Sequence, residues 1–336
     1  MVPEHSVRPR WLAIAVLAIV ASLAVAGCGG SGSGDRVSLV AYSTPKEAYA
    51  KQIAAFKQTP EGKDAEFDES YGASGDQSRS VASGLPADVV ALSLAPDVDK
   101  LVEPKKVAED WNAAPYDGFV TNSVVVLAVR KGNPKGIGGW EDIVKDGVDV
   151  IEPNPFTSGG ARWNVMAAYG SQIAQGRSEA EAEDFLERLF ENVTVQDKSA
   201  RDSLQTFSAG KGDVLLAYEN EAIAAKRKGV ELDYVVPDQT ILIQNPIALT
   251  EAGQGNEAAK AFVNFLRSPA GQRIYAEEGY RPVVASAAAG RGFPAPKQLF
   301  EIDRFGGWKA VNDRFFDPDD GVVAEIEKDK GVSTGG

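Results

Sequence analysis

Short apolar runs alternate along the chain with segments whose apolar residues recur every three to four positions. Examples are "RVSLVAY" followed by "TPKEAYAKQIAAFKQ", "VDVIEPN" followed by "GGARWNVMAAYG", and "GDVLLAY" followed by "ENEAIAAKRKG". The apolar runs predict buried strands, and the periodic segments predict helices packed against them. Strands that alternate with helices in this way are typical of βαβ units, so the pattern predicts an α/β fold with mostly parallel sheets.

The length of 336 residues favours two domains, since one domain commonly takes about 100–200 residues. Two segments are candidates for connections between them, "DGFVTNS" at 117–123 and "TILIQNPIA" at 240–248. With both as crossovers, residues 37–120 plus 247–336 form the first lobe and 121–246 form the second. A ligand is then expected between the lobes, outside the carboxyl ends of the strands.

The N-terminus carries the features of an export signal. Arg8 and Arg10 precede the apolar run "WLAIAVLAIVASLAVAG", which suits a signal peptide over residues 1–27. The closing "LAVAGC" resembles the lipobox of bacterial lipoproteins, in which the cysteine, here Cys28, is acylated, for example with palmitate. A flexible Gly/Ser tether follows over 28–36. We therefore expect an extracytoplasmic protein attached to the cell membrane by a lipid on Cys28; the alternative is a secretory signal followed by a free cysteine.

The charge balance excludes several classes of partner. The formal net charge is −13, and removal of 1–27 takes away two basic residues and one acidic residue, which leaves 33 against 47, or −14. An acidic surface of this kind argues against nucleic acid and against an anionic membrane face as partners. A bound anion would have to be held by the site itself.

The usual catalytic residues are scarce. The single histidine, His5, lies in the predicted signal peptide, and the single cysteine is Cys28. No Ser-His-Asp or Cys-His arrangement and no His/Cys zinc cluster can form from them. Glu219 and Glu221 could serve a two-carboxylate hydrolase, but their spacing sets them about 200° apart around a helix. We therefore expect no enzyme, no cofactor and no metal.

Several predicted helices begin directly after a predicted strand with residues that cap helix N-termini. Their capping residues are Thr44 with Pro45 and Glu47, Ser74 with Gln77, Ser158 before Gly159 and Gly160, and Ser199 with Asp202.

Such helix starts present unpaired N–H groups and a partial positive charge, which together favour an anion. Glycine beside the cap would let a ligand approach the backbone without a Cβ in the way. The alternative is that each is an ordinary cap with no ligand.

Longer stretches of the chain resemble a known family. "TSGGARWN", "ENEA", "ASGDQSRSV", and "SPAGQRIYAEEGYRPV" with "FGGW" are similar to segments of the sulfate-binding proteins that serve ABC-type sulfate/thiosulfate importers, and the similarity runs from about Val37 to Val323. The resemblance implies the two-lobed periplasmic-binding-protein type II fold, with sulfate in the cleft between the lobes. It also implies a monomeric receptor that delivers sulfate, or thiosulfate, to permease subunits of an importer.

The resemblance also implies a set of neutral donors to the anion. By motif these are the Ser74 hydroxyl, the loop Ser158, Gly159 and Gly160, the backbone of Ala200, and Tyr218 where the family pattern often has tryptophan. Ser43, which stands where the family commonly has aspartate, completes the set.

Arg162 and Arg201 follow the donor loops. They are expected either to bias the site electrostatically from behind the donors or to form plain interdomain salt bridges.

Two further functions stay open at this stage. One keeps the class and changes the ligand to thiosulfate, molybdate, tungstate or phosphate. The other is a lipid-anchored carbohydrate enzyme that uses two carboxylates, against which the Gly/Ser-rich caps and the lack of aromatic sugar platforms near Glu219 argue. Calorimetry with a panel of oxyanions separates them.

Overall fold

The computed structural model describes residues 36–332 and 334. The predicted signal peptide 1–27, Cys28 and all of the predicted tether except Arg36 lie outside the described residues. Within the described part of the chain, none of the helices combines the length and the apolar character needed to cross a membrane.

The elements follow the predicted alternation of strands and helices. The first group is β1 (Arg36–Tyr42), α1 (Lys46–Phe56), β2 (Glu66–Gly72), α2 (Ser74–Ala82), β3 (Val89–Ala91) and α3 (Ala95–Asp99). The second group is β4 (Phe119–Arg130), α4 (Trp140–Ile143), β5 (Val150–Ile151), α5 (Gly159–Ala174), α6 (Glu179–Asn192), β6 (Val193–Val195), α7 (Ala200–Ser208), β7 (Val214–Tyr218), α8 (Glu219–Arg227) and β8 (Leu232–Val235). The last group is β9 (Gln239–Leu249), α9 (Glu257–Arg267), α10 (Pro269–Glu277), β10 (Arg281–Pro282), β11 (Gln298–Phe300), α11 (Gly307–Phe315) and α12 (Val322–Asp329). Short 3-10 turns lie at Trp111–Ala113, Pro115–Gly118, Gly253–Gly255, Ala285–Ala288 and Ile302–Phe305.

The strands form one continuous hydrogen-bonded path in the order β2-β1-β3-β9-β4-β7-β5-β6. β1 pairs in parallel with β2 and β3, and β5 pairs in parallel with β6 and β7. Between these two triplets run β9 and β4, which are antiparallel to each other and to their outer neighbours. The predicted α/β fold class is confirmed, and the sheets are mixed because two long strands pass between the parallel triplets.

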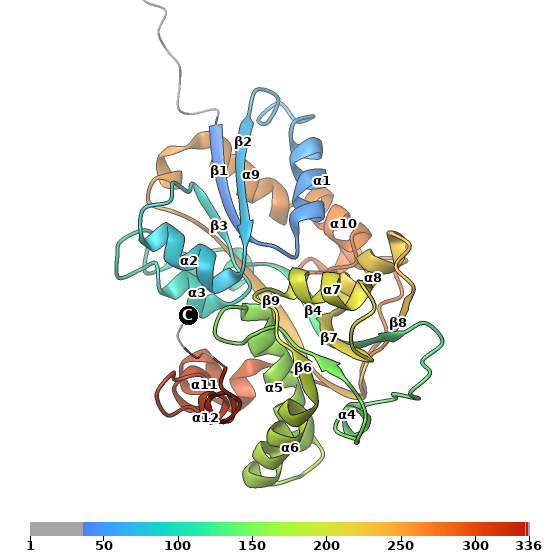
Figure 1. Cartoon of the computed structure of the whole chain (residues 1–336). Helices are drawn as coiled ribbons and strands as arrows, with labels where there is room; N and C mark the ends of the chain where they lie inside the picture. Colours follow the sequence, from blue (N-terminus) through green and yellow to red (C-terminus); the bar gives the residue numbers. More distant parts are fainter. Residues whose placement is uncertain (1–35, 333, 335–336) are drawn as a thin grey trace, which may run out of the picture. The chain divides into compact units, whose positions relative to one another are not determined.

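The buried core is divided at those two strands. In β4, Val120 packs with the side chains of β1 and α9, whereas Val124 packs with those of β7 and α8. In β9, Ile247 belongs to the first set, and Ile243 packs with α5 and its neighbours. We call the elements around β1–β3 the first lobe and those around β5–β7 the second lobe. Figure 1 shows them above and below the crossing strand β9.

The C-terminal segment departs from the predicted division, which placed all of 247–336 in the first lobe. Phe300, Phe315 and Val323 are buried in the same cluster as the side chains of α5 and α6. The ring of Phe315 lies 4.7 Å from that of Tyr169 on α5. A Cβ on Gly170 would meet the Phe300 ring at 2.4 Å, so this close packing requires glycine. The aromatic residues of the segment find their apolar partner surface on the second lobe.

Candidate functional site

The N-termini of three helices meet at one small cavity, which we call the three-helix cavity. α2 follows β2, α5 follows β5, and α7 follows β6, so each helix starts where a parallel strand ends. The carboxyl ends of the strands therefore bring these helix starts together. The cavity is lined by Tyr42, Ser43, Thr44, Gly72, Ala73, Ser74, Ser93, Ser158, Gly159, Gly160, Ser199 and Ala200.

The lining is neutral and rich in donors. None of the twelve lining residues is an aspartate, glutamate, lysine, arginine or histidine. No hydrogen bond within residues 36–332 and 334 uses the N–H groups of Gly159, Gly160 or Ala200, which lie in the first turns of α5 and α7. Unpaired N–H groups at helix starts carry a partial positive charge and attract anions.

Two of the predicted caps are confirmed. Ser158 is the N-cap of α5, and its Oγ accepts from the N–H of Ala161 at 3.4 Å. Ser199 is the N-cap of α7, and its Oγ accepts from the N–H of Asp202 at 3.2 Å. Each cap satisfies one N–H of its helix and leaves the preceding N–H groups unpaired beside the cavity.

Ser74 does not cap α2 as predicted. The N-cap is Ala73, and Ser74 is the first helical residue. Its Oγ donates to Oδ2 of Asp97 at 2.7 Å and accepts from the N–H of Ser93 at 2.9 Å. A hydroxyl can donate only one hydrogen bond, and here the buried carboxylate of Asp97 accepts it. In this structure the hydroxyl donation expected of Ser74 is directed away from the cavity.

Thr44 also differs from its predicted role. α1 begins at Lys46, its N-cap is Pro45, and no side chain caps it, so the expected box of Thr44 with Glu47 does not form. The Thr44 hydroxyl instead donates to Oε1 of Glu221 on α8 at 3.1 Å. A carboxylate accepts a hydrogen bond more strongly than a neutral group does, which accounts for the choice of Glu221 as the partner of the Thr44 hydroxyl.

The two adjacent glycines at the start of α5 have different roles. A Cβ on Gly159 would lie 2.9 Å from Cβ of Ser93 and 2.9 Å from Cγ of Leu94, so this glycine permits close packing between the lobes. A Cβ on Gly160 would lie 3.4 Å from Cβ of Ala200, which is an ordinary contact. That both glycines serve ligand approach stays a prediction; Gly159 in addition allows this packing, and Gly160 has space beside the cavity.

Tyr218 does not line the three-helix cavity. Its hydroxyl lies 2.7 Å from Oγ of Ser93, which does line it. Burial raises the pKa of Tyr218 above its ordinary value, so the phenol keeps its proton. Ser93 is not among the site residues predicted from the sequence, although it follows the apolar run "ADVVAL" and so stands, like the other site residues, just beyond the end of a strand.

The two arginines behind the donor loops differ from each other. Arg201 on α7 forms an ion pair with Glu47, and its Nη2 donates to the carbonyls of Ser43 at 3.1 Å and Thr44 at 3.0 Å. Arg162 on α5 has no ion pair among the described residues; its Nε donates to the carbonyl of Pro155 at 2.8 Å. Arg201 thus holds the loop at the end of β1. Burial lowers the pKa of Arg162.

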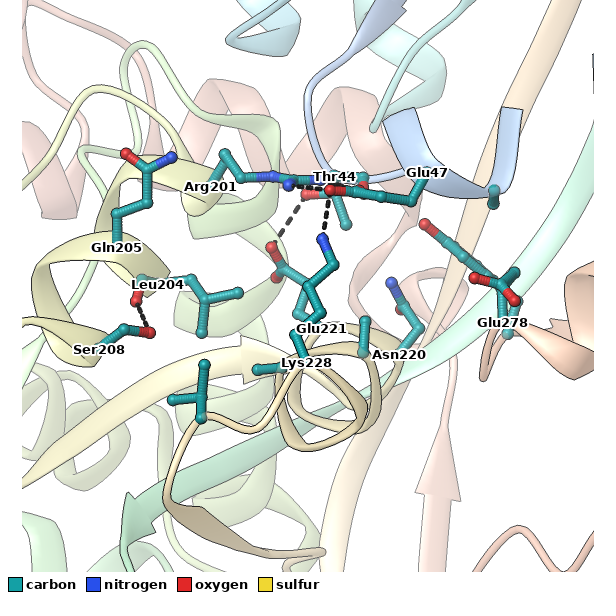
Figure 2. A pocket seen from close by; sticks show the side chains of 15 residues that line it. Thr44, Glu47, Arg201, Leu204, Gln205, Ser208, Asn220, Glu221, Lys228 and Glu278 are labelled. Carbon is teal, nitrogen blue, oxygen red and sulfur yellow. Dashed lines mark hydrogen bonds and ion pairs between the residues drawn. The ribbon is translucent and has the colours of Figure 1, made fainter. Parts of the chain in front are cut away.

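A second, larger cavity of about 330 Å³ lies beside the first between α1, α7 and α8. Figure 2 shows Arg201 and Lys228 directed at Glu47, and Thr44 bonded to Glu221, at its centre.

Glu219, the other candidate carboxylate, is buried against Arg281, with 2.8 Å between Nε and Oε2. The two carboxylates therefore have separate partners and do not face a common space, which argues against a two-carboxylate hydrolase. Residues 36–332 and 334 also contain no cluster of three metal-ligating side chains.

Comparisons with known proteins agree on one family. Residues 37–281 match the family described as "Bacterial extracellular solute-binding protein". A sulfate-binding protein of Synechococcus elongatus is 38% identical over 92% of this chain and 94% of its own length. The solved structure of the sulfate-binding protein SubI from Mycobacterium tuberculosis is 41% identical, with a TM-score of 0.81 over 84% of this chain and 99% of SubI. A thiosulfate-binding protein of Pseudomonas aeruginosa is less similar, at 34% identity over 85% of this chain and 90% of its own length.

Proposed function

This chain belongs to the sulfate-binding protein family of ABC-transporter solute-binding proteins, and we propose that it captures sulfate in the three-helix cavity for an ABC importer. It is a transport receptor and not an enzyme. The observation that carries the assignment of the site is the set of unpaired N–H groups at Gly159, Gly160 and Ala200 around a neutral cavity. Sulfate accepts hydrogen bonds and donates none, so a site built of donors suits it.

The energy available from such donors is sufficient. A hydrogen bond to a charged group nets about 1.5–3 kcal/mol, whereas micromolar binding needs about 8 kcal/mol in total. Helix dipoles add about 0.3–1 kcal/mol for each helix start. We infer that the local N–H groups, and not the dipoles, supply most of the binding free energy, and that the surplus offsets dehydration and closure of the lobes.

The proposed donor set follows from where the side chains point. The backbone N–H groups of Gly159, Gly160 and Ala200 are the core of the set, with Ser158 and Ser43 beside them. Ser74 contributes its backbone N–H and not its hydroxyl, because the hydroxyl donates its hydrogen bond to Asp97. Tyr218 does not line the cavity, and its hydroxyl bonds to Oγ of Ser93.

Thiosulfate is the second candidate ligand. It has the same charge and nearly the same shape as sulfate, with one sulfur in place of an oxygen. A relative named as a thiosulfate-binding protein shares 34% of its residues with this chain, against 38% and 41% for the two sulfate-binding relatives. The higher sequence identity to the two sulfate-binding relatives favours sulfate as the ligand.

We further propose a location and lobe boundaries for the receptor. The motif "LAVAGC" supports export and attachment of the receptor to the cell membrane by a lipid on Cys28. We propose a two-lobed monomer with boundaries near 120 and 246, in which the segment from Gln298 onward joins the second lobe.

Isothermal titration of the purified receptor, without the signal peptide, with sulfate, thiosulfate, molybdate and phosphate tests the function. We expect sulfate to bind at micromolar concentration or tighter, and more tightly than the other anions. Tighter binding of thiosulfate would change the ligand and keep the class. If none of the four anions binds, the proposed function is wrong.

A further inference from the structure

We propose that the hydroxyl of Ser93 donates to the bound anion and that Tyr218, from the other lobe, positions this hydroxyl and orients its proton. This inference rests on the proposed function, because it assigns a role to residues beside the same cavity. Ser93 follows β3 in the first lobe, whereas Tyr218 ends β7 in the second.

The backbone of Ser93 is held from both lobes. Its N–H donates to Oγ of Ser74, and its carbonyl accepts from Nε1 of Trp163 at 3.0 Å and from Nδ2 of Asn245 at 3.1 Å. Ser93 is 1% exposed and lines the three-helix cavity. With the backbone fixed, the remaining freedom of Ser93 is the direction of its hydroxyl proton.

That direction depends on Tyr218. The two hydroxyl oxygens are 2.7 Å apart, and only one of them can donate to the other. Tyr218 does not line the cavity and bonds to Oγ of Ser93, whereas Ser93 also faces the cavity, so with an anion bound Tyr218 donates to Oγ of Ser93. The proton of Ser93 is then free for the anion, and the donated bond polarises it and strengthens its own donation.

The reach of the two side chains supports this order. Ser93 lines the cavity and Tyr218 does not. The position of a Cβ on Gly159 is 3.0 Å from Oγ of Ser93, so this hydroxyl lies beside the first turn of α5 with its unpaired N–H groups. Because the two residues come from different lobes, closure of the lobes forms the pair and completes the donor set.

The pair also bears on which anions are accepted. A hydroxyl that receives a bond from Tyr218 is biased to donate outward, which suits an anion without protons. Without that bond the Ser93 hydroxyl can turn and accept a hydrogen bond from a ligand such as hydrogen phosphate. Tyr218 is therefore a specificity-determining residue that acts through Ser93.

Titrations with sodium sulfate and sodium phosphate test the proposal on the wild type, Ser93→Ala, Tyr218→Phe and the double variant. We expect Ser93→Ala to weaken sulfate binding by about 10-fold or more, the range for a lost bond to a charged group. Tyr218→Phe should weaken it by about 3-fold, and the double variant should bind as Ser93→Ala does. Ser171→Ala is the matched control, since its buried hydroxyl bonds only within its own helix, donating to the carbonyl of Ala168 and accepting from Nε2 of Gln172.

A second measurement separates positioning from a general structural effect. Tyr218→Phe should lower the ratio of sulfate to phosphate affinity by about 3-fold or more, whereas a structural defect would weaken both anions alike. This readout also holds if Ser93→Ala does not fold, which ligand-free thermal unfolding will show.

Two results would overturn the proposal. Sulfate binding by Ser93→Ala equal to that of the wild type would remove Ser93 from the donor set. An equal loss from Tyr218→Phe with and without Ser93 would mean that Tyr218 contacts the anion directly. A wild-type protein that binds no sulfate would overturn the proposed function itself, so the two failures are distinct.

Discussion

Arg201 on α7 and Glu47 on α1 form an ion pair across the two lobes, with 2.6 Å between Nη1 and Oε1. The same guanidinium donates to the carbonyls of Ser43 and Thr44. Because Ala200, the residue before Arg201, carries one of the unpaired N–H groups, this contact fixes a donor of one lobe relative to the cavity wall of the other. We therefore expect the pair to act on closure of the lobes and not on the anion directly.

Loss of Arg201 should weaken ligand binding more than fold stability. We expect Arg201→Gln to lower sulfate affinity by about 3- to 10-fold, within the 1.4 kcal/mol that a tenfold change represents. Lys228→Gln is the matched control, because Lys228 also pairs with Glu47 but does not hold the loop of Ser43 and Thr44. Calorimetry on both variants measures the difference. An equal loss of sulfate affinity in the two variants would mean that binding depends on neutralising the charge of Glu47 and not on the contact of Arg201 with the loop.

The contribution of Glu47 to stability should disappear in acid. The Arg201 guanidinium, assisted by Lys228, lowers the pKa of Glu47 to about 2, against an ordinary value of about 4.3. A lowered pKa in the folded state stabilises the protein above the unfolded value, and this stabilisation is lost as the pH falls toward 2. Since both side chains are partly exposed, we expect no more than about 1 kcal/mol.

Urea unfolding of the wild type and Glu47→Gln at pH 7, 4.5 and 3 measures this contribution. The difference in unfolding free energy should be constant from pH 7 to about 5 and should shrink at pH 3. The exposed Glu103, replaced by Gln, serves as the control. A difference that grows in acid would contradict the prediction.

A methyl group on Gly160 should block the anion without unfolding the protein. Its nearest neighbours would be Cβ of Ala200 at 3.4 Å and Oγ of Ser158 at 3.5 Å, which the fold tolerates. We expect Gly160→Ala to lower sulfate affinity by about 10-fold or more and Gly160→Val to abolish binding. Gly255→Ala, at a position with open space, is the control for thermal unfolding without ligand. Normal sulfate binding by both Gly160 variants would show that the glycine serves the backbone alone.

The receptor should discriminate sulfate from phosphate. Near neutral pH phosphate retains a proton that needs an acceptor, and an unpaired buried donor costs about 1–3 kcal/mol. No carboxylate lines the three-helix cavity; Asp76 is paired with Arg79 and Lys198, and Asp202 is occupied by Ser199. We expect a preference of about 100-fold, or about 2.7 kcal/mol, from pH 6 to 8. Competition titration at fixed ionic strength measures it, and comparable affinities would reveal an acceptor in the site.

The anchor is tested on the intact exported protein. We expect Cys28→Ala to remain unprocessed or to leave the membrane fraction, because the proposed lipid attaches to that sulfur. Fractionation and mass spectrometry of the N-terminus report both outcomes. Processing and membrane retention identical to the wild type would rule out the lipid.

The features that the sequence determined by itself are local ones. The alternation of apolar runs with helical periods predicts the α/β fold, because each element needs one buried face at its own period. The caps at Ser158 and Ser199 are set by residues three positions apart, so they could be identified without the tertiary structure. Resemblance over most of the chain then indicated the family and half of the twelve residues that line the cavity.

Only the tertiary structure decided which partner each hydroxyl group hydrogen-bonds to. Ser74 donates to Asp97, 23 residues away, Tyr218 pairs with Ser93, 125 residues away, and Thr44 donates to Glu221, 177 residues away. A hydroxyl rotates freely and takes the best acceptor within reach, and folding alone determines which acceptor that is. The packing of the C-terminal aromatic residues on α5 has the same cause, since an apolar segment joins whichever uncovered apolar face the completed lobes leave beside it.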